Sequence, residues 1–303
     1  MIKNVTMAEG GPIFSRIVAG VMNWGIWGRQ LSTQEMLRLM TQCLELGVST
    51  FDHADIYGHY TTEAEFGAAL RLQPNLRADM QLVSKCGIKL VTPNRPHHHI
   101  KSYDTSMEHI IWSAEQSLKN LHTDYLDLLL LHRPDVLLHP HDVAEAFTRL
   151  RQEGKVRHFG VSNFTPSQFE LLHTYFPLIT NQVEANMIHL EPFHDGTFDQ
   201  CLRYRLCPMV WSPLGGGALF RAAADERISR ILNTAQTLAN KRTGATPDQI
   251  LLAWLLRHPA KLLPVLGTIN IERIAAAVAA LHIQLTREEW HELWSASIGK
   301  EVD

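Results

Sequence analysis

Short apolar runs alternate along the chain with longer segments in which apolar residues recur every three or four positions. This alternation is typical of strand and helix units that build a parallel sheet. Ser32 and Glu35 form a capping box before the first helical segment, and Gly47 follows its last apolar position as a stop signal. The run 126–131 is so apolar that both faces of its strand must be covered.

Eight strands are expected, at residues 16–19, 48–51, 81–84, 126–131, 158–161, 179–182, 208–211 and 263–266. Helical sequence separates them, and eight such units close a barrel. Residues 3–14, with Gly10-Gly11 in their middle, predict a β-hairpin before the first strand, and Thr286 with Glu289 predicts a capped helix near the end. We therefore expect one (β/α)8 TIM-barrel domain over residues 1–303, with an N-terminal β-hairpin and a C-terminal helical tail.

A doubly wound sheet is the rival architecture for alternating strands and helices. It would normally carry a G-x-G-x-x-G loop after its first strand, and residues 19–23 contain no such loop. Gly215-Gly216-Gly217 comes too late in the chain to serve that purpose.

The composition narrows the class of partner. A hydrophobic content of 45%, a charged content of 19% and a net charge of -3 are ordinary for a globular protein, and the absence of Lys and Arg clusters argues against nucleic acid. No apolar stretch is long enough for a bilayer, and the first ten residues do not resemble a signal peptide. Cys43, Cys86, Cys201 and Cys207 have no metal-like spacing, which favours free thiols in a reducing cytoplasm.

Ionisable residues follow three consecutive strands, at the end of a barrel where active sites lie. These residues are Asp52, Tyr57, Lys85 and His132. A phenol needs a nearby ammonium to act in acid–base chemistry at neutral pH, and an ammonium inside a barrel needs a counter-charge. Each residue taken alone has a structural explanation, such as a cap, a packed ring or an exposed strand end. Their combination instead favours proton transfer to a carbonyl oxygen, with His132 as a hydrogen-bond donor.

Four spaced motifs resemble the aldo-keto reductase superfamily over residues 16–281, and within it the bacterial YdhF-type oxidoreductases. They are Phe51-Asp52-His53-Ala54-Asp55-Ile56-Tyr57-Gly58, then Glu115-Gln116-Ser117-Leu118 with Asp124-Tyr125-Leu126-Asp127, then residues 154–164, and finally Trp211-Ser212-Pro213-Leu214-Gly215. The resemblance implies NADP(H)-dependent reduction of an aldehyde or ketone group on a small molecule by hydride transfer. It assigns the catalytic tetrad to Asp52, Tyr57, Lys85 and His132, with Tyr57 as proton donor.

The resemblance also implies an extended NADP(H) and the residues that would contact it. They are Gly20, Met22, Ser162, Asn163, Gln182, Trp211, Ser212, Leu214, Gly215, Gly267, Thr268 and Arg273. Relatives commonly have Tyr at the position of Trp211 and Lys-Ser at Gly267-Thr268, so this chain departs from the pattern at the ring and at the adenosine end. Thr268 and Arg273 can still bind a 2'-phosphate.

Trp24, Trp27 and Tyr60 follow the first two strands and are candidates to line a substrate pocket, with packing within the loops as the alternative. Residues 91–103 are expected to form a mobile loop over the site, and the adjacent His97, His98 and His99 lack other ligands at zinc-like spacing. We expect a monomer without a metal. Two alternatives remain open: an aldolase barrel with Lys85 as a Schiff-base nucleophile, and a barrel that binds NADPH as a sensor or partner subunit.

Overall fold

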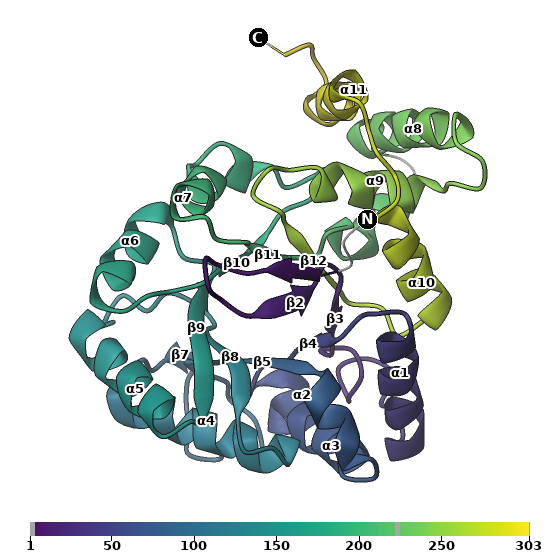
Figure 1. The fold of residues 1–303 in the computed structure, drawn as a ribbon. Coiled ribbons are helices and arrows are strands. Elements are labelled where there is room, and N and C mark those ends of the chain that lie inside the picture. The colour runs from purple at the N-terminus through teal and green to yellow at the C-terminus, as the bar shows by residue number, and fades with distance from the viewer. Residues whose placement is uncertain (1–3, 222–224, 303) are drawn as a thin grey trace.

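Eight parallel strands close into a barrel in the computed structural model, which describes residues 4–221 and 225–302 (Figure 1). Around the barrel they are β3 (Val18–Gly20), β4 (Thr50–Asp52), β5 (Gln81–Cys86), β8 (Leu126–Leu131), β9 (Val156–Ser162), β10 (Asn181–Glu184), β11 (Met209–Trp211) and β12 (Leu263–Leu266). β12 pairs with β3 and thereby closes the ring. The predicted (β/α)8 barrel is confirmed.

Helices surround the barrel, as the alternating pattern predicts (Figure 1). They are α1 (Thr33–Glu45), α3 (Thr62–Leu70), α4 (Met107–Leu121), α5 (Pro140–Gln152), α6 (Pro166–Tyr175), α7 (Thr197–Tyr204), α9 (Pro247–Leu256) and α10 (Ile271–Ala280). The capping box of Ser32 and Glu35 is present at the start of α1, and Thr165 caps α6 in the same way. Such caps satisfy backbone N–H groups that the first helical turn leaves unpaired.

Strand alternation sorts the apolar side chains into two cores. On β8, Leu128 and Leu130 belong to a small cluster inside the barrel, whereas Leu129 and Leu131 belong to the large cluster between strands and helices. Both faces of β8 are thus covered, which explains its continuous apolar run.

The N-terminal hairpin closes one end of the barrel (Figure 1). It consists of β1 (Asn4–Thr6) and β2 (Ile13–Ser15), which pair antiparallel. Phe14 is wholly buried and packs into the interior cluster, and the Met7 carbonyl accepts a hydrogen bond from the Cys207 backbone N–H at 2.9 Å. Because the hairpin occupies the amino ends of the strands, only their carboxyl ends are left for a site.

The C-terminal tail is also helical, as expected. α11 (Arg287–Ile298) begins with the Thr286 and Glu289 capping box and packs beside α8 (Glu226–Asn240), outside the ring of helices (Figure 1). Trp290 stacks on Trp254 of α9 with ring centroids 5.0 Å apart, and each indole N–H donates to the other residue's carbonyl oxygen. α8 is an addition that the strand-and-helix pattern does not predict.

Several element bounds differ from the predictions. The first, second and sixth strands each begin two residues later than expected, because pairing around the closed barrel decides which residues enter the ladder. Residues 91–103, expected to be a mobile loop, include β7 (Ser102–Tyr103), which pairs with β6 (Ile88–Lys89). Short helical turns complete the fold: α2 (Tyr57–Tyr60), η1 (Pro74–Asp79), η2 (Glu191–Phe193) and η3 (Gly215–Phe220). In the described ranges, no helix has the length and apolarity needed to cross a membrane.

Candidate active site

Polar side chains face the barrel interior at the carboxyl ends of the strands. Val83 and Leu130 belong to the interior cluster, so Lys85 and His132, two residues further along, lie on the same side of their strands. The same alternation turns inward the side chains of Asp52, Ser162, Gln182 and Trp211. One pattern therefore produces both the apolar interior and the polar ring above it.

Lys85 is the centre of this ring. Its Nζ donates to Asp52 Oδ2 at 2.7 Å, to the His53 carbonyl oxygen at 2.8 Å and to the Tyr57 hydroxyl at 3.1 Å. The side chains of Lys85 and Asp52 are only 1% and 3% exposed. All three ammonium hydrogens thus have a partner, which a buried cation requires.

Tyr57 reaches these polar side chains from α2, the short helical turn that follows β4. Its hydroxyl reaches Lys85, and its ring lies edge-on to His132 with centroids 6.0 Å apart. The structure therefore brings together Asp52, Tyr57, Lys85 and His132, which lie up to 80 positions apart in the sequence.

The electrostatics suit a proton donor beside a fixed positive charge. Burial raises the pKa of the Tyr57 hydroxyl, and the Lys85 ammonium opposes that rise. Burial acts to lower the pKa of Lys85, but Asp52 and Tyr57 together raise it above its ordinary value, so Lys85 stays charged. Tyr57 is therefore protonated at neutral pH, with a cation placed to stabilise its phenolate.

His132 is held as a neutral imidazole. Burial lowers its pKa well below the usual range, and the positive charges of Lys85, Arg133 and Lys101 lower it further. Its Nδ1 is buried without a hydrogen-bond partner, while its carbonyl oxygen accepts from Asn163 Nδ2 at 3.2 Å. A neutral imidazole can donate a hydrogen bond to a carbonyl oxygen without adding a charge.

The residues expected to hold a nicotinamide form one hydrogen-bonded network. Asn163 donates from Nδ2 to Ser162 Oγ at 2.8 Å and accepts from Trp211 Nε1 at 3.0 Å. Ser162 Oγ donates to the Gln182 carbonyl oxygen at 2.9 Å. The amides of Asn163 and Gln182 and the indole of Trp211 thus lie together at the carboxyl ends of β9, β10 and β11. Amide groups beside an indole are a set of side chains that suits a nicotinamide amide and ring.

The segment expected to meet the pyrophosphate is shaped by positive φ angles. Ser212 and Gly215 have φ angles of 49° and 62°, and Gly216 and Gly217 continue the left-handed turns of η3. Within this turn the Gly215 and Gly217 backbone N–H groups donate to the carbonyl oxygens of Ser212 and Leu214 at 2.8 and 3.1 Å, and glycine at these positions lets the backbone approach a ligand closely. Leu214 packs against the large core and anchors this loop.

The adenosine end is open. Arg273 is exposed in the first turn of α10, and Thr268 Oγ1 accepts from the Asn270 N–H at 3.1 Å. Asn23 Nδ2 donates to the Gly267 carbonyl oxygen at 2.9 Å, which joins this loop to the one after β3. Gly20 lies so close to the Leu266 carbonyl that a Cβ would stand 2.8 Å from it, and Met22 is 41% exposed beyond it.

The three aromatic residues expected to line a substrate pocket separate into two groups. Trp27 lies near the catalytic end, 6.1 Å from the Tyr57 ring, and Tyr60 belongs to the same small apolar cluster. Trp24 instead is wholly buried against Phe51 and Phe66 in the core behind β4, so its assignment to the pocket is wrong. Apolar residues of the strand-to-helix loops can turn either way, and only packing decides.

A family model described as "Aldo/keto reductase family" matches residues 16–298, nearly the whole chain. The chain belongs to the aldo/keto reductase family. It is similar to "Oxidoreductase YdhF" of Escherichia coli K12, with 46% identity over 100% of both chains. It is also similar to a "6-dehydroglucose reductase" of Agrobacterium fabrum, with 41% identity over 95% of this chain and 96% of the relative. Among solved structures, an aldo/keto reductase from Klebsiella pneumoniae in complex with NADP and acetate is 28% identical and covers 97% of this chain and 94% of its own, with a TM-score of 0.77.

Two features of this aldo/keto reductase escape the sequence motifs. Gln182 Nε2 donates to Asp52 Oδ1 at 2.9 Å, so Gln182 and Lys85 hold the two carboxylate oxygens separately. Behind Lys85, His53 is buried with both ring nitrogens unpartnered, and burial followed by the Lys85 charge lowers its pKa to about 3. The sequence signal for His53 is its place in the polar residues 52–55, directly after the expected strand at residues 48–51.

Proposed function

We propose that this aldo/keto reductase uses NADP(H) to reduce an aldehyde or ketone group of a small molecule, with Tyr57 as the proton donor. The observation that carries the proposal is the 3.1 Å contact between the Tyr57 hydroxyl and a buried, fully partnered Lys85 ammonium. NADPH, when bound, supplies the hydride, and the residues expected to hold it are Ser162, Asn163, Gln182, Trp211, Ser212, Gly215, Thr268 and Arg273.

The chain's own residues divide the remaining tasks. His132 orients the carbonyl oxygen by a hydrogen bond, and Tyr57 transfers its proton to that oxygen as negative charge develops on it. Lys85 stabilises the resulting phenolate, while Asp52 keeps the ammonium charged and in place. Solvent returns a proton to Tyr57 before the next turnover.

The name of the Agrobacterium relative indicates that a carbonyl on a sugar is one substrate to test. Trp27, beside Tyr57, offers an aromatic face of the kind that binds the apolar side of a sugar ring. We also propose a monomer in the cytoplasm. Two facts support this: one chain supplies the whole ring of polar residues, and all four cysteines are free and buried.

Tyr57→Phe tests the proposal, because it removes the hydroxyl and keeps the ring. General acid catalysis contributes about 10²–10⁴-fold, so we expect kcat to fall by that factor while the Kd for NADPH stays within about twofold. Nicotinamide absorbance with a panel of aldehydes, ketones and oxidised sugars measures kcat, and fluorescence titration measures the Kd for NADPH. Full turnover in this variant would refute Tyr57 as the donor, and NADPH binding without turnover by the wild-type chain would favour a sensor role. Borohydride trapping of substrate on Lys85 would indicate an aldolase instead.

A further inference from the structure

The turn that carries Tyr57 has an unfavourable backbone conformation. Gly58, His59 and Tyr60 follow Tyr57 directly, and all three have left-handed φ angles, of 60°, 58° and 72°. This region is readily available to glycine but costs free energy for histidine and tyrosine, and consecutive left-handed residues are rare. Some contact outside the turn must offset this cost.

The segment that follows β5 supplies such contacts. The Tyr60 hydroxyl accepts a hydrogen bond from the Leu90 backbone N–H at 2.9 Å and donates to the Ile88 carbonyl oxygen at 3.3 Å. Asn94 Nδ2 donates to the carbonyl oxygen of His59 at 2.8 Å. Both left-handed residues that are not glycine are thus bonded to residues 88–94.

This segment is itself well anchored. Ile88 and Lys89 pair with β7, and Thr92 and Arg95 form an isolated bridge that closes a tight loop. The Arg95 guanidinium lies 4.3 Å from the centroid of the Tyr60 ring and 5.3 Å from that of Trp112 on α4. A cation between two aromatic faces joins the turn to a rigid helix.

We propose that Tyr60 and Asn94 are positioning residues, which hold the turn Gly58–Tyr60 in its left-handed form and thereby place the Tyr57 hydroxyl beside Lys85. This inference rests on the proposed role of Tyr57 as proton donor. Neither residue needs to touch the substrate, because both act on the backbone through the turn that α2 makes immediately after Tyr57.

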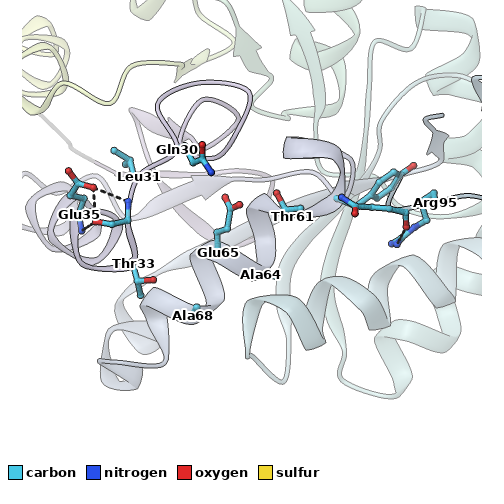
Figure 2. Close-up of a pocket in the computed structure, with 12 residues that line it drawn as sticks. Gln30, Leu31, Thr33, Glu35, Thr61, Ala64, Glu65, Ala68 and Arg95 are labelled. Atoms are coloured by element: carbon cyan, nitrogen blue, oxygen red, sulfur yellow. Dashed lines mark hydrogen bonds between the residues drawn. The ribbon is translucent and has the colours of Figure 1, made fainter. Parts of the chain in front are cut away.

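The contacts are accessible from outside the barrel. Tyr60, Asn94 and Arg95 form one end of an open groove of about 890 Å³, whose other walls are the start of α1 and the outer face of α3 (Figure 2). No member of the Asp52, Tyr57, Lys85 and His132 set lines this groove. Asn94 is exposed, so its side chain can be removed without opening the barrel core.

The test compares Tyr60→Phe and Asn94→Ala with Tyr103→Phe, which removes a hydroxyl from an exposed tyrosine of β7. Each of the first two variants loses hydrogen bonds to the turn, and we expect kcat for carbonyl reduction to fall about three- to tenfold in each. KM for the carbonyl, the Kd for NADPH and the melting temperature should change little. Tyr103→Phe should match the wild type. Unchanged kcat in both variants, or a higher KM with unchanged kcat, would overturn the proposal.

The pH profile distinguishes positioning from general loosening. The groups that face Tyr57 are Lys85 from β5, Asp52 from β4, Asp55 from the following loop, and neutral His132 from the end of β8. Lys85 is the one that favours the phenolate, so a hydroxyl that moves away from it should keep its proton to higher pH. We therefore expect the apparent pKa in the pH–rate profile of alcohol oxidation to rise by at least about half a pH unit in Tyr60→Phe. An unshifted profile with a lower melting temperature would indicate a purely structural role and overturn the inference.

Two further variants separate this inference from the proposed function. Because Gly accepts a φ of 58° without strain, His59→Gly in the Asn94→Ala background should restore part of the lost kcat. In a Tyr57→Phe background, Tyr60→Phe should leave the residual rate unchanged, since no hydroxyl remains to be placed. A further loss there would refute positioning through Tyr57, whereas full activity of Tyr57→Phe alone would refute the proposed function itself.

Discussion

Replacing Lys85 with Met tests the electrostatic centre of the site. The change removes a buried charge and keeps a side chain of similar length, so packing inside the barrel is largely preserved. The Tyr57 hydroxyl then loses the cation 3.1 Å away, and the Asp52 carboxylate keeps the hydrogen bond from Gln182 Nε2.

The size of the effect follows from this distance. Two unit charges 3.1 Å apart attract by about 5 kcal/mol at an effective dielectric constant of about 20, which corresponds to an upper limit of about 4 pKa units. Because Lys85 shares its charge with Asp52, we expect the smaller shift of about 1–3 units seen for a group beside one opposite charge. At a pH below the pKa of Tyr57, each unit by which this pKa rises lowers the phenolate fraction tenfold. Alcohol oxidation at such a fixed pH should therefore slow about 10–1000-fold.

Rates of NADP⁺-dependent oxidation and NADPH-dependent reduction between pH 5 and 10 measure the shift, and NADPH fluorescence shows whether the cofactor site is intact. Lys89→Met is the matched control, because Lys89 lies four residues away and its partly exposed pair with Asp104, 3.4 Å apart, contributes little. An unchanged oxidation rate in Lys85→Met, together with an unchanged basic limb of its pH–rate profile, would refute this role of Lys85.

Two further outcomes follow from other parts of the structure. Arg273→Ala should raise the Kd for NADPH at least about tenfold and leave the Kd for NADH within about twofold, since a charge-assisted hydrogen bond contributes about 1.5–3 kcal/mol. Replacing the exposed Arg287 with Ala is the control, and an equal effect of Arg273→Ala on both cofactors would disprove the phosphate contact. Burial and Lys85 lower the pKa of His53 to about 3, so its contribution to stability is complete above the ordinary value of about 6.5 and declines by about 1.4 kcal/mol per unit as the pH falls toward 3. Urea unfolding between pH 4 and 7 should therefore show a shallower decline in His53→Gln, and parallel curves would contradict the assignment.

The barrel could be predicted from local patterns because each strand and helix carries its own signal. The run at Leu126–Leu131 marks a strand covered on both faces, and Thr286 with Glu289 marks a helix start, whatever the rest of the chain does. Strand bounds are less accurate, since no turn signal separates Arg16 and Ile17 from Val18, yet the ladder between β12 and β3 begins only at Val18.

The candidate site was predictable in part for a similar reason. Strand alternation and the barrel's one open end direct Asp52, Lys85 and His132 to a common region, and the motifs identify them. Trp24 shows the limit of that reasoning, because a loop aromatic can turn into the core as easily as toward the mouth, and the neighbouring Phe51 and Phe66 decide the outcome.

The sequence by itself determined the periodicities, the helix caps and the chemistry available at the strand ends, all of which depend on neighbours within a few positions. Only the tertiary structure decided that Gln182 bonds Asp52 across the barrel, and that Leu90 and Asn94 bond the left-handed turn Gly58–Tyr60. These contacts join residues 30 to 130 positions apart. Their partners are chosen by the closure of the barrel and the packing of its loops, which no local pattern encodes.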